Sequence, residues 1–280
     1  MSDREAIATV RKPGHRLWVA RELEAVVEAL GFGDALTFRA ALADGRLVEG
    51  GRAPHRLLAL PGRVERLRVR PARRGGVFGG LLGGRYLSPE RAPRELALWL
   101  SLRRRGVPLP TPVAAIASRR GGLWSCHFAA LEREGARDGR AWLAAAPSPR
   151  ALRLAALAFA RALRRLHDAG VVHGDLNLRN LLIEGEGDAL ACLFVDLDHA
   201  RARAVVSPRD RLAELARLAR SLEKLGLADR VDARLRARVV VAYCGSDRTL
   251  RRALLASQGR EQRRLARHRI AWRAARILGT

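Results

Sequence analysis

The spacing of apolar residues predicts one long helix near the middle of the chain, from Pro149 to Ala169. Apolar side chains recur there at intervals of three and four residues, which places them on one helix face: Leu152, Ala155, Ala156, Phe159, Leu163 and Leu166. Ser148 is a suitable N-cap, Pro149 takes the first helical position, and Gly170 follows the last residue. Local signals therefore define both ends of this helix.

Similar patterns predict four more helices, at Arg21–Leu30, Ala35–Leu42, Pro93–Arg105 and Arg209–Leu225. The arginine-rich residues beyond the last of these are also predicted to be helical. The remaining apolar residues fall in shorter runs, which indicate β-strands.

Short β-like runs begin at Gly45 and are separated by glycine and proline: RLVEGG at 46–51, HRLLAL at 55–60 and VERLRVR at 64–70. Val113–Ala117 and Leu123–Leu131 are two further predicted strands, and a connecting hinge is expected at Glu132–Asp138. This order predicts an α+β protein with three parts. They are a helical extension at 1–44, a lobe with a small antiparallel sheet at 45–133, and a mainly helical lobe at 134–280.

Chemistry-bearing residues gather in VVHGDLNLRNLLIEGEGDALACLFVD, residues 171–196. His173, Asp175 and Asn180 form an H-x-D-x-x-x-x-N string, and Asp196 ends the apolar run that follows. LLI at 181–183 can pair with ALACLFV at 189–195 through the turn EGEGD, so Asn180 and Asp196 can converge on one cation.

Such a hairpin suits phosphoryl transfer. Asp175 could accept the proton of an acceptor hydroxyl, while Asn180 and Asp196 hold Mg²⁺ against the phosphates of ATP. The alternative is a turn rich in Asp and Asn, which both favour turns through local hydrogen bonds. Asp198 could also bind metal, or pair with a nearby arginine.

A nucleotide also needs donors for its phosphates. Gly50 and Gly51 can form the glycine turn that covers them, or an ordinary hairpin turn. Neither Lys12 nor Lys224 lies where the strand lysine of a kinase would be. Arg68 and Arg70 alternate onto one face of a strand, so either could meet Glu95 in the next predicted helix.

The amino-acid composition limits the classes of partner that we expect for the protein. The formal net charge is +25, and all of the 53 basic residues except Lys12 and Lys224 are arginine. Such a surface suits nucleic acid, an anionic membrane face or an acidic substrate, although a GC-rich genome would also raise the arginine content. Aromatic residues make up only 5% of the chain, so nucleic acid is the least favoured partner.

The location is predicted from cysteine usage and hydropathy. Cys126, Cys192 and Cys244 are odd in number and far apart, which favours a reducing cytoplasm over a disulfide framework. The first residues show no apolar signal-peptide region, and we expect no membrane-spanning helix. The sequence does not indicate an oligomeric state.

The chain resembles the lipopolysaccharide kinase family, and is most similar to its 3-deoxy-D-manno-octulosonic acid (Kdo) kinase branch. The stretches that carry the resemblance follow the order of the family: LRVRPARRGG at 67–76, RYLSPERAPREL at 85–96, GVPLPTPVA at 106–114, LHDAGVVHGDLNLRNLLI at 166–183, FVDLDHAR at 194–201 and LARLARSLEKL at 215–225.

This resemblance implies a protein-kinase-like two-lobed fold, ATP with Mg²⁺, and phosphorylation of a Kdo hydroxyl on a lipid A precursor at the cytoplasmic face of the inner membrane. By position, Asp175 resembles the catalytic aspartate, Asn180 and Asp196 the metal ligands, Glu95 the helix glutamate and Arg70 the strand cation. A kinase acting on a protein or small molecule, and a pseudokinase binding an anionic partner, are the alternatives.

Overall fold

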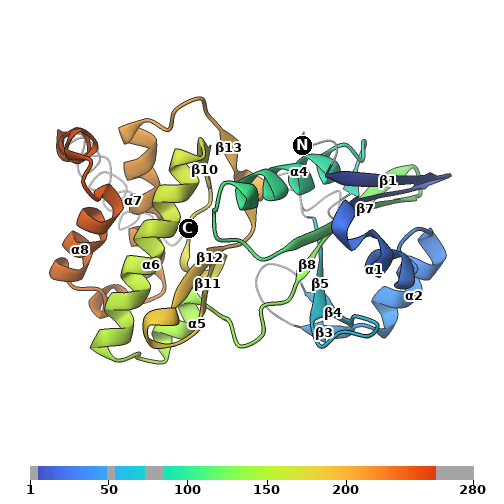
Figure 1. Cartoon of the computed structure of the whole chain (residues 1–280), viewed down its shortest axis with the longest axis horizontal. Coiled ribbons are helices and arrows are strands. Elements are labelled where there is room, and N and C mark those ends of the chain that lie inside the picture. The colour runs from blue at the N-terminus through green and yellow to red at the C-terminus, as the bar shows by residue number, and fades with distance from the viewer. Residues whose placement is uncertain (1–5, 49–53, 73–84, 257–280) are drawn as a thin grey trace, which may run out of the picture. The chain divides into compact units, whose positions relative to one another are not determined.

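The computed structural model describes residues 6–48, 54–72 and 85–256. The chain separates into two units, 1–134 and 135–280, one residue from the predicted boundary between the lobes. Each unit has its own layers of secondary structure (Figure 1).

An eight-stranded antiparallel sheet forms the first unit. Its strands in spatial order are β1 (Ile7–Lys12), β2 (His15–Ala20), β7 (Pro112–Arg120), β8 (Leu123–Leu131), β5 (Arg66–Pro71), β4 (His55–Ala59) and β3 (Arg46–Val48), and β6 (Arg85–Tyr86) also pairs with β8. The predicted strands at 113–117 and 123–131 are confirmed by β7 and β8. The sheet thus brings β5 and β8 side by side, with Arg70 opposite Phe128.

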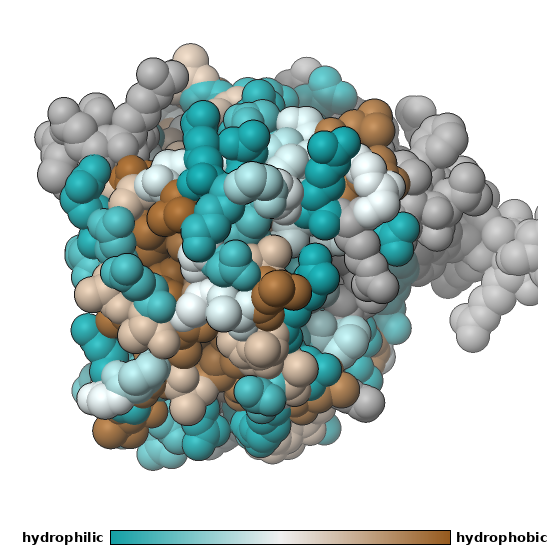
Figure 2. Space-filling model, turned by 90° about the vertical axis from the view of Figure 1, so that its right-hand side faces the viewer, coloured by the Kyte–Doolittle hydropathy of each residue, from teal (hydrophilic) through white to brown (hydrophobic). Residues whose placement is uncertain are grey.

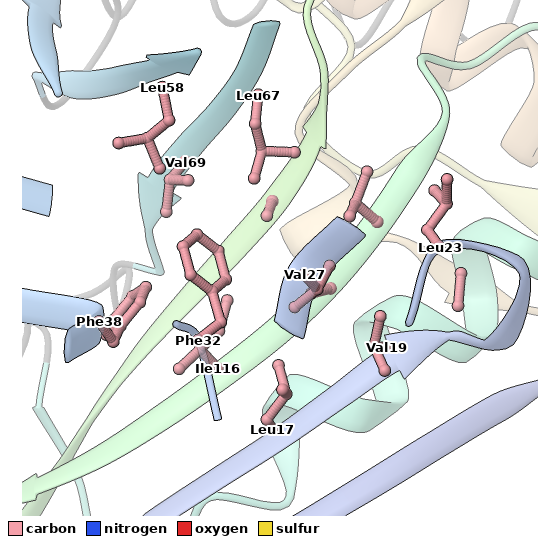
Figure 3. Close-up of a cluster of buried hydrophobic side chains, with 14 of the residues drawn as sticks. Leu17, Val19, Leu23, Val27, Phe32, Phe38, Leu58, Leu67, Val69 and Ile116 are labelled. Atoms are coloured by element: carbon pink, nitrogen blue, oxygen red, sulfur yellow. The ribbon is translucent and has the colours of Figure 1, made fainter. Parts of the chain in front are cut away.

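One face of this sheet is covered by a short 3-10 helix (Arg21–Leu23), α1 (Glu24–Ala29) and α2 (Ala35–Asp44), which confirm the two predicted N-terminal helices. Figure 3 shows Phe32, Phe38 and Val27 in one cluster of buried side chains with Leu67 and Val69 of β5. All five side chains are at most 1% exposed, and burial of each is worth about 1.5–3 kcal/mol. Because Leu67 and Val69 point into this core, alternation turns Arg68 and Arg70 to the opposite face.

Helix α4 (Arg91–Arg104) packs beside that opposite face, where Trp99 lies 4.9 Å from Phe128 between ring centroids. The helix begins two residues before its predicted start. Its buried residues include Glu95, which therefore sits against the sheet instead of in solvent.

The prediction of a helical extension at 1–44 is wrong in one respect, because β1 and β2 are strands of the main sheet. Strand β2 pairs with β7, placing Val19 opposite Ala114. Most of β2 is buried, including consecutive residues on both faces, so its sequence lacks the polar alternation typical of a half-buried strand.

Helices dominate the second unit. They are α5 (Gly139–Ala144), α6 (Pro149–Asp168), α7 (Pro208–Lys224), α8 (Ala233–Cys244) and a helix at 248–256, with short 3-10 helices at Leu178–Asn180, Gly187–Ala189, Leu197–His199 and Ala228–Arg230. Two small antiparallel sheets accompany them: β10 (Val171–Val172) with β13 (Arg201–Ala202), and β9 (Arg137–Asp138) with β11 (Leu181–Glu184) and β12 (Ala191–Phe194).

Helix α6 confirms the strongest prediction. Ser148 Oγ accepts a hydrogen bond from Ala151 N at 3.2 Å, and Gly170 adopts φ +73° at the other end. A Cβ at Gly170 would lie 2.5 Å from the carbonyl oxygen of Arg203, so a side chain would clash there. The chain therefore passes from the end of α6 directly into β10 and the H-x-D string.

Polar side chains, of which Arg211, His167 and Tyr243 are buried, join α6 to α7 and α8. Arg211 donates to Tyr243 Oη at 2.6 Å and to Asp168 Oδ1 at 3.1 Å, and His167 Nδ1 lies 2.6 Å from Tyr243 Oη. No helix within residues 6–48, 54–72 and 85–256 combines the length and apolar character needed to cross a membrane. On the face shown in Figure 2, hydrophobic residues are interspersed with hydrophilic ones.

Candidate phosphoryl-transfer site

The loop after β10 holds Asp175 by its backbone. The carbonyl oxygen of Asp175 accepts two side-chain amides, from Asn180 Nδ2 at 2.8 Å and from Asn177 Nδ2 at 2.9 Å. Asn177 also caps the following 3-10 turn, because its Oδ1 accepts from Arg179 N at 3.0 Å. The carboxylate of Asp175 is thus carried on a fixed loop and is half-buried.

The predicted hairpin is confirmed: β11 and β12 pair antiparallel, with Leu181 opposite Phe194. Val195 N donates to Asn180 O at 3.0 Å, so Asp196 follows directly after a residue bonded to Asn180. Since Asn180 also bonds to Asp175, the three residues named by the sequence come together in one place. Their predicted roles as base and metal ligands fit this geometry.

Asp196 adopts a left-handed backbone, with φ 61° and ψ 64°. A side-chain-bearing residue in this conformation costs on the order of 1–3 kcal/mol, and such costs cluster at functional sites. The conformation places Asp196 between the end of β12 and the turn Leu197–His199. The strain therefore falls on the residue that was predicted to bind metal.

The donor set suits Mg²⁺. The amide nitrogen of Asn180 faces a carbonyl, which leaves Oδ1 as the atom able to bind a cation. Together with the carboxylates of Asp175 and Asp196 it offers only hard oxygen donors. Mg²⁺ is usually bound by one or two carboxylates with phosphates and water completing its shell, so no larger protein cluster is required.

His173 links the two halves of this site. Its ring Nε2 donates to the carbonyl of Val195 at 3.1 Å, and its ring is fully buried. Burial lowers the pKa of His173 below its usual 6.5, and this effect outweighs the opposing influence of Glu214 and the backbone bond. A neutral imidazole that bridges the Asp175 loop and the Asp196 strand is a structural link and not the base.

Glu214 of α7 is a site residue that sequence reasoning missed. Its carboxylate is 0% exposed and accepts from the backbone nitrogens of His173 at 2.7 Å and Gly174 at 3.2 Å. Arg217 donates to the same carboxylate at 2.7 Å. The available signal was an acidic residue on the apolar face of an amphipathic helix, where a buried carboxylate requires partners.

Gly174 was also missed as a site residue. It has φ +84°, and a Cβ there would lie 2.1 Å from the carbonyl oxygen of His199. Only glycine permits this approach of two backbones next to Asp175. The segment after Asp196 thus packs directly on the loop that carries the candidate base.

In the first unit, Arg70 of β5 forms an ion pair with Glu95 of α4. Arg70 lies over the ring of Phe128, 5.3 Å from its centroid. Arg68, the other candidate, instead makes a two-bond pair with Glu132 and contacts His55. The structure therefore brings Glu95 to Arg70, while the predicted glycine turn at Gly50 and Gly51 lies outside the described residues.

Comparison with known proteins identifies relatives among the lipopolysaccharide kinases. Residues 65–238 match the model of the Lipopolysaccharide kinase (Kdo/WaaP) family. A 3-deoxy-D-manno-octulosonic acid kinase from Vibrio cholerae is 32% identical over 160 residues, which is 56% of this chain and 65% of that protein. The enzyme of the same name from Haemophilus influenzae is 31% identical over 158 residues, 54% of this chain and 63% of that protein. These matches span just under two thirds of the length of each relative.

A solved structure of WaaP in complex with acyl carrier protein superposes with a TM-score of 0.57 and 21% identity, covering 83% of this chain and 90% of that one. This likeness confirms the predicted α+β, protein-kinase-like fold. The family match covers more than half of the chain and includes the ion pair of the first unit and the whole Asp175–Asp196 hairpin. On this evidence the chain belongs to the lipopolysaccharide kinase (Kdo/WaaP) family.

Proposed function

We propose that this protein transfers the γ-phosphoryl group of ATP, with Mg²⁺, to a hydroxyl of an inner-core sugar of a lipopolysaccharide precursor, with Kdo as the acceptor. The observation that carries the proposal is the bond from Asn180 Nδ2 to the Asp175 carbonyl at 2.8 Å, in a hairpin whose other strand ends at Asp196. The bond links the candidate base to one oxygen ligand, Asn180, and the hairpin brings the second ligand, Asp196, to the same place. The names of the relatives support Kdo as the acceptor.

In this proposal Asp175 orients the acceptor hydroxyl and accepts its proton late in transfer. Oδ1 of Asn180 and the carboxylate of Asp196 hold Mg²⁺, which when bound neutralises charge on the phosphates. Arg70, oriented by Glu95, binds a phosphate through its planar fork, in the place where other kinases use lysine. Gly50 and Gly51 cover the phosphates, with residues 45–133 serving as the nucleotide lobe and 134–280 as the catalytic lobe.

The acceptor also determines the proposed location. A Kdo–lipid A precursor is an anionic glycolipid held in a membrane, and a net charge of +25 favours contact with an anionic surface. We therefore place the protein in the cytoplasm, bound peripherally to the cytoplasmic face of the inner membrane. Arginine-rich attraction of this kind weakens with salt, which separates it from insertion into the bilayer.

The test is transfer of labelled phosphate from ATP to Kdo–lipid A by the Asp175→Asn protein. We expect loss of at least about a hundredfold in kcat, because proton acceptance typically contributes 10²–10⁴-fold. Asp188→Asn is the matched control: the same substitution in the same hairpin, at a side chain that is 87% exposed. Transfer that is equal in the two variants, or that goes to protein or a small alcohol in place of the glycolipid, would refute the proposal.

A further inference from the structure

Two exposed arginines of the second unit lie close to the candidate base, one along the chain and one across the pairing of β10 with β13. Arg179 lies in the 3-10 turn Leu178–Asn180, between Asp175 and the metal ligand Asn180, and is exposed. Arg201 is exposed on β13, where it pairs with Val172 of β10. Within the described part of the chain neither guanidinium has a hydrogen-bond or ion-pair partner, unlike Arg70, Arg68 and Arg211.

The register of β10 and β13 brings Arg201 to the loop. Val172 is three residues before Asp175, so their Cα atoms are at most about 11 Å apart. Two residues before Arg201, the backbone of His199 packs on Gly174. The strand pair in Figure 1 therefore runs alongside the segment that carries the base. Arg179 belongs to the same loop.

Charge explains why an acceptor would need these arginines. Asp175 and Asp196 already make the site negative, and the phosphates of ATP add to this. Kdo is a sugar acid, so its carboxylate would be repelled when its hydroxyl approaches Asp175. Arg179 and Arg201 add positive charge beside this site, four residues after Asp175 and three residues after Asp198 along the chain.

We propose that Arg179 and Arg201 bind the carboxylate of the acceptor sugar and so select a sugar acid over a neutral sugar. Arginine suits this role because its planar fork matches a carboxylate with two hydrogen bonds. The inference rests on the proposed function and adds the feature of the acceptor that is recognised. Phosphate groups on lipid A offer a second anion with similar chemistry, so the experiment must separate the two sources.

The experiment compares steady-state transfer by the Arg179→Gln and Arg201→Gln proteins on three acceptors: Kdo–lipid A, the same lipid with the Kdo carboxylate as its methyl ester, and Kdo–lipid A lacking its phosphates. Arg153→Gln is the control. Arg153 is an exposed arginine in the first turns of α6, about 22 Å along the helix from its end, and its loss changes the net charge equally.

With the free acid, we expect each site variant to raise KM for the acceptor about tenfold while KM for ATP stays constant, since one charge-assisted bond is worth that much. The ester should be a poor acceptor for every protein, and the site variants should lose nothing further with it. Removal of the lipid phosphates should leave the tenfold effect in place. Arg153→Gln should behave as the wild type on all three.

Four results would overturn the inference. An equal rise in KM on acid and ester would show that the arginines do not bind the carboxylate. A rise in KM that disappears when the lipid phosphates are removed would show that the arginines bind those phosphates. Site variants that match Arg153→Gln would remove their role altogether while the kinase proposal stands. A wild-type protein that transfers phosphate to none of the three acceptors would overturn both proposals together.

Discussion

Replacement of Glu214 by alanine should loosen the loop that carries the candidate base. The carboxylate is fully buried and is the acceptor for two backbone N–H groups, those of His173 and Gly174. Each N–H left without an acceptor costs about 1–3 kcal/mol, or about 2–6 kcal/mol for the two. Removal of one partner from a buried ion pair costs a similar 3–5 kcal/mol or so. The side chain of Arg217 is 30% exposed and can recover hydration, so we expect a loss near the lower end, about 3 kcal/mol.

Two measurements check this expectation. Urea denaturation followed by circular dichroism gives the free energy of unfolding, and hydrogen exchange gives the opening of the His173 and Gly174 amides themselves. The Glu223→Ala protein is the control, because Glu223 is exposed on the same helix and its loss should change stability by no more than about 0.5 kcal/mol. The reasoning is refuted if Glu214→Ala matches this control in both stability and amide exchange.

The remaining predictions concern a glycine, a histidine and the ion pair. Gly174→Ala should abolish transfer, because its Cβ would strike the carbonyl of His199; Gly187→Ala, also at positive φ but with open space around it, should keep activity, and equal activity would contradict the account. Burial lowers the pKa of His167 to about 3, so the folded state stays neutral while the unfolded state gains a proton below pH 6.5. Stability from this group is therefore lost as pH falls from 6.5 towards 3, by about 1.4 kcal/mol per pH unit, and urea titrations should show that His167→Gln removes that slope. Arg70→Lys should retain measurable transfer with a raised KM for ATP, whereas Arg70→Ala should lose ATP binding in a thermal-shift assay; unchanged binding in both would exclude Arg70 as a phosphate ligand.

Local signals explain which parts of the fold could be predicted. Helix α6 was predicted to within a residue because Ser148, Pro149 and Gly170 act within their own turns of the chain. The β1–β2 hairpin was missed because β2 is buried on both faces and shows no alternation. Its place in the sheet depends on pairing with β7, almost a hundred residues later, and no local pattern encodes that pairing.

The candidate site also has one part that local sequence predicts and other parts that depend on contacts between distant segments. The Asp175–Asp196 hairpin was predictable because its strands are joined by a short turn. The choice between Arg68 and Arg70 stayed open on the residues alone and was made for Arg70 only through the family resemblance, since both lie on one strand face and the partners Glu132 and Glu95 come from other elements. Glu214 binds the loop from forty residues away in sequence, so only the packing of α7 reveals it.

The most direct test of the central claim is the mass of the lipid product. Purified protein, ATP and Mg²⁺ should convert Kdo–lipid A into a species heavier by one phosphate group, and fragmentation should place that phosphate on the Kdo residue. Asp175→Asn should yield no such species, while Asp188→Asn should yield it at the wild-type rate. A phosphate found elsewhere than on Kdo, or one added equally well by Asp175→Asn, would contradict the account.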